Sequence, residues 1–233
     1  MMEAAYLLLF IYVLAYFVKG ISYSSQDSTI LRSRITKFLL FAVTWCAYVF
    51  VVCATGFIKE TSLPPRMPLL LILPLFGIMG WFMFSKRSTQ FLDRVPIHYP
   101  VFFQSFRVAV ELLIYWAFLK GLAPKEASFE GYNFEIYFGA FALIVGFAVY
   151  HKKLNKRLLV IWNIIGLCFL AMIVGIFTTI LYNPAIWGYD TAVVNPEMMT
   201  FPFMLIPSVF MPVAVFSHVF SIRQVTLDKL INS

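Results

Sequence analysis

Charged residues are scarce in this chain: Asp, Glu, Lys and Arg together make up 12% of its 233 residues. A soluble domain carries about 25%, so this composition argues against a domain that folds in water. Hydrophobic residues make up 61% of the chain, and 26 of them are phenylalanine. We therefore expect a lipid bilayer around the protein, and we attribute the net charge of +7 to membrane topology rather than to a nucleic-acid partner.

Cysteine is scarce as well, and its placement excludes a disulfide framework. Cys46, Cys53 and Cys168 all lie in apolar stretches. Cys46 and Cys53 would be about 10 Å apart along one helix, which is too far for a disulfide, so we read all three as small hydrophobic side chains. Basic residues are also missing before the first apolar stretch, so we expect that stretch to be a retained helix rather than a signal peptide.

Long apolar runs are abundant by contrast. Seven stretches are long enough to cross about 30 Å of hydrocarbon as helices. They are residues 4–21, 36–57, 67–85, 101–122, 134–150, 158–181 and 201–222. The connections between them are short, and none has the composition of a separate soluble domain. The sequence therefore predicts an all-α integral membrane protein in which residues 1–233 form a single seven-helix transmembrane domain.

Lysine and arginine are distributed unevenly between the connections. Of the 18, thirteen follow odd-numbered stretches or lie in the C-terminal tail, four lie on the opposite side, and Arg107 lies within a stretch. Because cytoplasmic loops are enriched in Lys and Arg, we expect the N-terminus outside and the C-terminus in the cytoplasm.

Two segments with paired prolines indicate an internal repeat. RMPLLLILPLFG (66–77) and TFPFMLIPSVFM (200–211) each hold two prolines separated by five or six residues. This likeness predicts parallel repeats in stretches one to three and five to seven, with the fourth as connector. Such a 3+1+3 arrangement is known among transporters.

The fourth stretch carries a polar stripe on an otherwise apolar helix. At about 100° per residue, Gln104, Arg107, Glu111 and Tyr115 fall within an arc of roughly 80°. A charged side chain at bilayer depth costs about 2.5 to 17 kcal/mol, so such residues face partners or water. Arg107 and Glu111 are four residues apart, which predicts that they pair with each other.

Polar residues of the sixth and seventh stretches fall at a similar depth. Counting from the predicted cytoplasmic ends, Arg107, Asn163 and His218 lie about 6 to 9 Å into the hydrocarbon. Gln104 shares this layer, and Glu111 lies just beyond it. Each is costly when it faces lipid and cheap when it faces the others, so we expect these side chains to converge on one binding site.

Prolines predict breaks in the helices beside this site. We expect kinks at Pro74, Pro207 and Pro212. Pro207 and Pro212 lack the amides that would bond the carbonyls of Phe203 and Ser208, so the sequence predicts free carbonyls there. Broken helices next to buried charge are typical of transporter sites.

Three functional classes fit this pattern. The first is a carrier or binding protein for a small polar or anionic solute, with Arg107 as the anion-binding charge, Glu111 as its counter-ion, and Asn163 and His218 as hydrogen-bonding partners. The second is an intramembrane enzyme, a hydrolase that is metal-dependent or not, using His218 and Glu111. The third is a sensor or structural membrane subunit in which the Arg–Glu pair only locks helices together.

The histidines offer two cofactor alternatives. His98, His151 and His218 would supply three zinc ligands. His151 and His218 at similar depth would supply two axial ligands of a haem. Neither pattern has the spacing of an established motif, so we expect no metal and no cofactor.

The second half of the chain resembles a group of bacterial multi-pass membrane proteins of uncharacterised function. The motifs that carry the likeness are Phe106-Arg107-x3-Glu111, Phe129-Glu130-Gly131-x-Asn133-Phe134-Glu135, Trp162-Asn163-x2-Gly166-Leu167, Phe201-Pro202-Phe203, Pro207, Pro212, His218 and Arg223-Gln224. This chain departs from the group at Tyr132, where a basic residue is expected, and at Glu135, where Asp is usual. The resemblance implies the seven-helix layout in a bacterial inner membrane and supplies no reaction.

Overall fold

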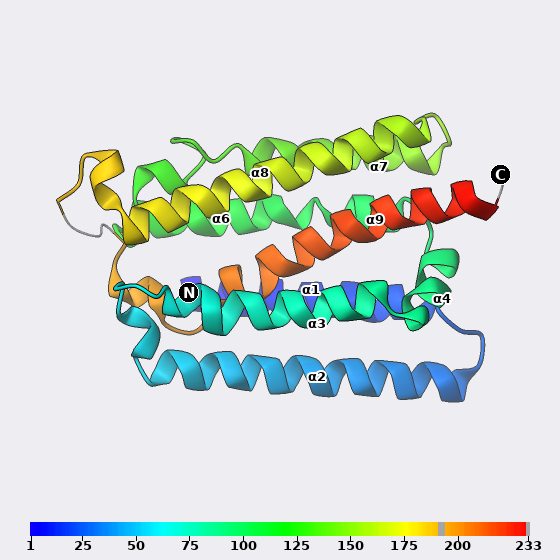
Figure 1. The fold of residues 1–233 in the computed structure, drawn as a ribbon, viewed down its shortest axis with the longest axis horizontal. Coiled ribbons are helices and arrows are strands. Elements are labelled where there is room, and N and C mark those ends of the chain that lie inside the picture. The colour runs from blue at the N-terminus through cyan, green and yellow to red at the C-terminus, as the bar shows by residue number, and fades with distance from the viewer. Residues whose placement is uncertain (191–193, 232–233) are drawn as a thin grey trace.

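The computed structural model describes residues 1–190 and 194–231, with side chains described through residue 227, and these residues are helical or lie in turns and loops (Figure 1). The all-α prediction is confirmed. Five helices are long and apolar enough to cross a membrane: Met2–Ser22, Ser28–Ala54, Tyr99–Leu119, Lys156–Tyr182 and Ile206–Leu227. A sixth span exists if Pro68–Phe84 and Lys86–Arg94, which meet at an angle of 77°, are taken together.

The helices have the following bounds in chain order. They are α1 (Met2–Ser22), α2 (Ser28–Ala54), η1 (Phe57–Lys59), η2 (Pro68–Ile72), α3 (Leu73–Phe84), α4 (Lys86–Arg94), α5 (Tyr99–Phe103), α6 (Phe106–Leu119), η3 (Lys125–Ala127), α7 (Glu135–Tyr150), α8 (Lys156–Tyr182), η4 (Pro184–Trp187), η5 (Pro196–Met199), η6 (Ile206–Phe210) and α9 (Met211–Ile231). The starts of α2 and α8 are fixed by side-chain caps: Asp27 accepts from the Thr29 amide at 2.7 Å, and Asn155 accepts from the Arg157 amide at 2.8 Å.

The fifth predicted span is a shorter helix. α7 has 16 residues, about 24 Å of helix, which is less than the roughly 30 Å of a hydrocarbon core. In Figure 1, α8, which has 27 residues, extends further to the left than α7. The structure thus supports five or six long apolar helices, and the seven-span count stays a prediction.

The core of the bundle lies between α6 and α9. More than half (56%) of the most apolar part of Tyr99–Leu119 and of Ile206–Leu227 is buried, against 22% of α1 and 17% of α2. α9 packs on α8, α5, α3 and α4, while α6 packs on α7 and α1. α2 packs on α1 at the edge of the bundle (Figure 1). Arg107 and Glu111 on α6 and His218 on α9 therefore lie inside the protein.

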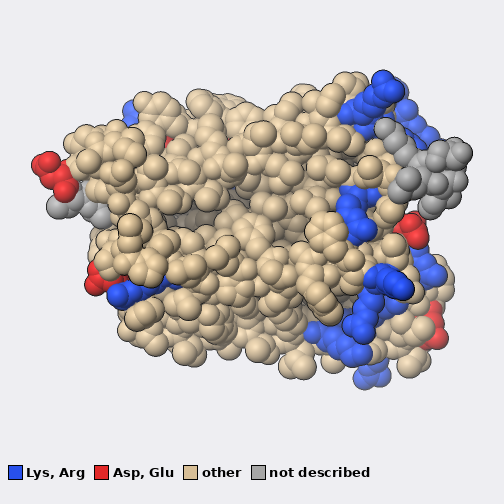
Figure 2. All heavy atoms as spheres, viewed as in Figure 1, with Lys and Arg blue, Asp and Glu red and all other residues tan. Residues whose placement is uncertain are grey.

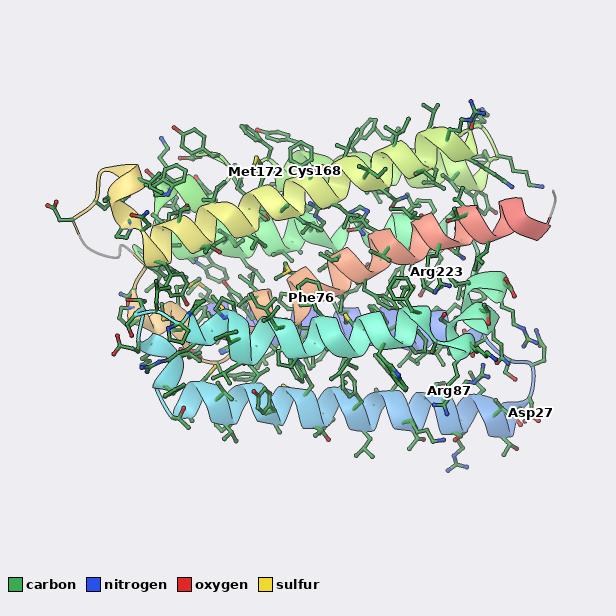
Figure 3. The ribbon with its side chains drawn as sticks, viewed as in Figure 1. Asp27, Phe76, Arg87, Cys168, Met172 and Arg223 are labelled. Carbon is green, nitrogen blue, oxygen red and sulfur yellow. The ribbon has the colours of Figure 1, made fainter. Side chains whose placement is uncertain are left out.

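Basic residues gather at one end of the molecule. Figure 2 shows most visible lysines and arginines at the right-hand end and a broad uncharged belt across the middle. Figure 3 places Asp27, Arg87 and Arg223 toward that same end. This separation matches the uneven charge distribution of the sequence, and the direction of insertion stays a prediction.

Both proline-containing segments that suggested a repeat depart locally from regular α-helix. η2 and η6 are single turns of π-helix, each followed directly by an α-helix, and they contact each other. Pro74 is the second residue of α3, while Pro207 lies in η6 and Pro212 is the second residue of α9. π-turns of this kind are frequent at functional sites. π-turns therefore lie beside these prolines, and the kinks at Pro74, Pro207 and Pro212 stay predictions.

The carbonyls that Pro207 and Pro212 deprive of an amide are not free, contrary to the prediction. The Phe203 carbonyl accepts a backbone amide three residues later at 3.1 Å. The Ser208 carbonyl accepts the indole Nε1–H of Trp45 at 3.0 Å. Buried backbone groups are costly when unpaired, and a side chain from α2 meets this requirement.

Helix α2 also bonds the other proline-containing segment, η2. Pro74 lacks the amide that would bond the Leu70 carbonyl, and the hydroxyl of Tyr48 donates to that carbonyl at 3.0 Å. Trp45 and Tyr48 are three residues apart on α2 and share a face. α2 therefore holds η2 and η6 through one hydrogen bond each.

Trp45→Phe is expected to lower the free energy of unfolding by about 1–3 kcal/mol, since the Ser208 carbonyl is left buried without a donor. Val43→Ala, at a position of α2 that is 64% exposed and carries no polar group, is the matched control and is expected to change the free energy of unfolding by less than about 0.5 kcal/mol. Thermal unfolding of both purified variants measures the difference. Equal losses would show that burial of the carbonyl does not set the cost.

Candidate functional site

Four helices bring polar side chains together in the core of the bundle. Arg107 lies in the first turn of α6, Glu135 begins α7, Asn163 lies in α8 and His218 lies in α9. All four are buried, with exposed fractions between 0% and 3%. We call these four residues the polar network.

Arg107 is the centre of the polar network. Its Nη2 forms an ion pair with Oε2 of Glu135, and its Nη1 lies 3.3 Å from Nε2 of His218. A guanidinium only donates hydrogen bonds, so Nε2 of His218 accepts and carries no proton. The guanidinium thus lies between a carboxylate on one side and a neutral imidazole on the other.

Asn163 fixes the other face of His218. Nδ1 of His218 donates to Oδ1 of Asn163 at 2.8 Å. The amide nitrogen of Asn163 donates to the Leu159 carbonyl at 2.8 Å and to Oγ of Ser221 at 3.0 Å. Both ring nitrogens of His218 are therefore engaged, which leaves neither of them free as a general base or as a metal ligand.

Arg107 forms its ion pair with Glu135, so the predicted pairing with Glu111 is wrong. The carboxylate in contact with Arg107 belongs to Glu135, and Glu111 instead accepts from Nδ2 of Asn133. Asn133 also donates to the Ala127 carbonyl at 3.0 Å and accepts from the Glu135 amide at 3.2 Å. Asn133 therefore ties the Glu111 carboxylate to the backbone at the start of α7.

Small residues let the helices approach closely around the polar network. A Cβ added to Gly139 on α7 would lie 3.1 Å from the amide of Val108 and 3.2 Å from Cβ of Arg107 on α6. A Cβ added to Gly166 on α8 would lie 2.4 Å from Cε1 of His218 and 2.6 Å from Cζ of Phe138. The missing side chain at Gly166 is therefore what makes room for the imidazole.

Aromatic rings line the polar network on its other side. The guanidinium carbon of Arg107 lies 4.7 Å from the ring centroid of Phe138, a cation–π distance. Phe138 stacks on Trp162 with centroids 4.8 Å apart, and Trp162 lies 5.5 Å from the His218 ring. These rings exclude water from the ion pair and so strengthen it.

Besides Glu111, two further predicted site residues lie outside the polar network. Gln104 is fully buried, as expected for its layer, but its amide donates to the Ala214 carbonyl at 3.0 Å. Tyr115 donates to the exposed Glu130 at 2.6 Å. The prediction that Tyr115 belongs to the buried cluster is therefore wrong, because the second half of α6 is next to the loop before α7 rather than next to α9.

Sequence reasoning missed Glu135, Asn133 and Ser221. Glu135 is the second residue of the predicted stretch 134–150 and was not among the predicted site residues. The available signal was its position, since Glu135 directly precedes an apolar stretch and no lysine or arginine follows within that stretch. A carboxylate at the start of an apolar stretch, like one in its middle, therefore predicts a cationic partner.

An apolar cavity reaches this site. Its volume is about 320 Å³. Its wall is formed by side chains of η2, α3, α6, α7, α8, η5, η6 and α9 and of the segments that adjoin η2, η5 and η6. Arg107, Glu111 and Glu135 are its charged members, and the other lining residues are apolar apart from Thr178. Both π-turns contribute to the wall.

Two atoms of the ion pair lack a protein partner. Nε of Arg107 and Oε1 of Glu135 are buried, and no hydrogen bond to either is formed among the residues that the structure describes. An unpaired polar atom of a charged group costs more than about 1–3 kcal/mol when buried. Both residues line the cavity, so a hydrogen-bonding ligand in the cavity is in a position to satisfy them.

The three histidines do not form a zinc site. Within residues 1–190 and 194–231, no three His, Cys, Asp or Glu side chains are grouped so that they could hold a metal ion. The ring of His98 lies 5.0 Å from that of Tyr150, which in turn lies 5.1 Å from that of His151. His218 belongs to the polar network, and its occupied ring nitrogens also argue against the haem alternative.

No protein-family model, curated protein or solved structure matches the chain. The structure therefore supports an all-helical protein with five or six candidate membrane spans, without assigning it to a family.

Proposed function

We propose that the protein is a membrane carrier or binding protein for a small polar or anionic solute, and that the cavity beside Arg107 is its site. The observation that carries the proposal is the placement of Arg107, Glu111 and Glu135 on the wall of an otherwise apolar cavity. Functional pockets typically combine apolar walls with a few placed polar groups. Buried charge that lines a cavity is typical of solute pathways in membrane proteins.

The residues would divide the work as follows. Arg107 offers Nε to an acceptor group of the solute, while Glu111 and Glu135 receive its donors. Asn163 and His218 act as positioning residues, because they hold the guanidinium without lining the cavity themselves. The π-turns η2 and η6 give this part of the wall the irregular backbone that lets a helix change shape.

The proposal includes the topology predicted from the sequence. α7 packs on α6 and α8 and would be a seventh, shorter span. Its length would be completed by the inward loop that contains the buried residues Ala127, Ser128 and Asn133. The basic end seen in Figure 2 would face the cytoplasm of a bacterial cell, with the N-terminus outside.

Ligand-induced stabilisation tests the proposal. Purified protein is heated with inorganic phosphate, acetate, glycine or glycerol, and a solute at a hundred times its Kd is expected to add about 2.7 kcal/mol. The melting temperature would then rise by roughly 5–10 °C. Glu111→Gln should remove the shift, whereas Glu197→Gln, an exposed carboxylate in the outer loop, should leave it unchanged.

Transport is tested separately with the solute that gives the shift. Its uptake into proteoliposomes under a pH gradient should fall in Glu111→Gln and persist in Glu197→Gln. Flux that is indifferent to Glu111→Gln would count against a carrier.

The structural alternative rests on one observation, namely that the polar network joins four helices. A protein in which the Arg107–Glu135 pair only locks helices together would show no shift with any of these solutes. The enzyme alternative gains no comparable support, because the hydroxyl of Ser217 donates to the Val213 carbonyl in its own helix and His218 has no free nitrogen.

A further inference from the structure

The cavity reaches the surface in the uncharged belt, away from both ends of the molecule. Leu73 at the start of α3 is 55% exposed and Thr178 on α8 is also exposed, and both line the cavity. Figure 2 shows a hollow within this belt, at the position between α8 and α3 in Figure 1. In a bilayer the belt faces acyl chains, so this opening leads to lipid.

Helix packing explains the opening. α3 and α8 each pack on α9. Because both helices contact α9, they lie on either side of it and leave a gap between them. The π-turns η2 and η6 contribute Pro68, Ile72, Ile206 and Pro207 to the cavity wall. The gap is therefore built into the fold rather than left by one small side chain.

The wall suits a flexible hydrocarbon chain. α8 presents Leu170, Ile173, Val174 and Phe177, which share one face at helical spacing. Five methionines complete the wall, namely Met67, Met198, Met199, Met204 and Met211. Methionine is unbranched and adaptable, and it is common where a surface must accommodate variable apolar ligands.

The volume sets how much of a ligand the cavity holds. A water-sized group occupies about 30 Å³, so 320 Å³ accommodates roughly ten such groups. A polar head with a short run of methylenes fills this space. A longer chain passes out between α3 and α8 into the surrounding lipid. A small water-soluble solute alone would leave the apolar wall uncovered.

The charged residues of the cavity wall restrict the chemistry of the ligand's polar head group. Arg107 is already paired with Glu135, and Glu111 is a second carboxylate. An anionic head would meet two carboxylates and a guanidinium that has a partner. The unpaired Nε of Arg107 requires an acceptor, and the unpaired Oε1 of Glu135 requires a donor. A hydroxyl group supplies both.

We infer that the ligand of this site is a single-chain amphiphile with an uncharged, hydroxyl-bearing head, which enters sideways from the bilayer between α3 and α8. Its head lies against Arg107 and Glu135, and its chain follows the apolar face of α8. This inference rests on the proposed function, which it narrows from small polar solutes in general to a lipid-like one.

Photo-crosslinking tests the inference. The full chain in lipid nanodiscs is irradiated with 1-monopalmitoylglycerol that carries a diazirine in its acyl chain, and labelled peptides are identified by mass spectrometry. Labels are expected on the wall residues Val174, Phe177 and Met199. Val174→Trp fills the opening and is expected to lower the labelling at least about tenfold, while Ile165→Trp on the exposed face of the same helix leaves it unchanged.

Leu73→Trp closes the gap from the opposite wall, so the inference stays testable if Val174→Trp fails to fold. It is expected to lower the labelling as well. Equal labelling in these variants and in Ile165→Trp would overturn the inference, because the probe would then report only the lipid that surrounds the protein.

Competition separates this inference from the proposed function. Unlabelled 1-monopalmitoylglycerol should displace the probe. If glycerol or inorganic phosphate displaces it as well, the site takes free polar solutes, and the inference fails while the proposed function stands. If palmitate displaces it better, the head is anionic and the inference fails at the head. If nothing is captured and no polar solute stabilises the protein, both fail.

Discussion

Arg107→Gln is expected to destabilise the protein strongly, because it leaves the Glu135 carboxylate buried without its cation. Glu135 is 2% exposed and contacts Arg107 from another helix. Removing one partner of a buried ion pair costs about 3–5 kcal/mol. A domain has about 5–15 kcal/mol in total, so this loss removes much of the stability.

The second substitution identifies the partner. Adding Glu135→Gln to Arg107→Gln removes the orphaned charge and is expected to restore most of the stability, whereas adding Glu111→Gln is not. The readout is thermal unfolding of the purified variants, with yield of folded protein as a second measure. Recovery with Glu111→Gln and not with Glu135→Gln would mean that the sequence-based pairing was right and the pairing seen here is wrong.

Gly166→Ala is expected to be nearly as damaging, although it adds a single methyl group. Its Cβ would lie 2.4 Å from Cε1 and 2.5 Å from Nε2 of His218, and neither ring atom can move without breaking a hydrogen bond to Arg107 or Asn163. Overpacking of a core costs about 1–3 kcal/mol, and the displaced imidazole adds the cost of an unpaired buried group. We therefore expect a fall in melting temperature of roughly 5–15 °C.

Gly175→Ala is the matched control. Gly175 lies on the same helix, and a Cβ there would have no atom within 4 Å outside that helix's local backbone. Replacing an unconstrained helical glycine by alanine is expected to raise stability by about 0.5–1 kcal/mol. Similar losses in both variants would show that helix α8, rather than the fit of His218 against Gly166, sets the effect.

The layer of buried polar residues was predictable because it follows from depth alone. Arg107, Asn163 and His218 lie on three apolar helices, two predicted to run in one direction and one in the other, so counting from their cytoplasmic ends places them at one level. The cost of charge in lipid then requires that they meet, and the contacts of His218 with the other two confirm that they do.

The carboxylate partner was not predictable by the same means. Periodicity within a helix favours Glu111, four residues from Arg107. The actual partner begins another helix and reaches Arg107 because the loop before α7 folds inward, with Asn133 bound to Glu111 and to the Ala127 carbonyl. Loop conformation depends on such individual contacts and leaves no periodic signal in the sequence.

The loss of backbone amides at the prolines was predictable, but the groups that bond the affected carbonyls were not. Pro74, Pro207 and Pro212 each remove an amide, which local chemistry dictates. Whether a freed carbonyl faces the cavity or a neighbouring side chain depends on which helix packs there. Here Trp45 and Tyr48 of α2 donate hydrogen bonds to two of these carbonyls. The sequence does not indicate which residues of two distant helices lie opposite each other, so these bonds could not be derived from it.

The proposed site has one central feature: the guanidinium of Arg107 lies between Glu135 and His218 and borders a cavity that opens to lipid. A density map of the protein in lipid nanodiscs, at a resolution that shows side chains, tests it in one measurement. We expect continuous density from Glu135 through Arg107 and His218 to Asn163, with the cavity between α3 and α8 beside it. Density that placed Arg107 against Glu111 alone, or turned these side chains toward the acyl chains, would contradict it.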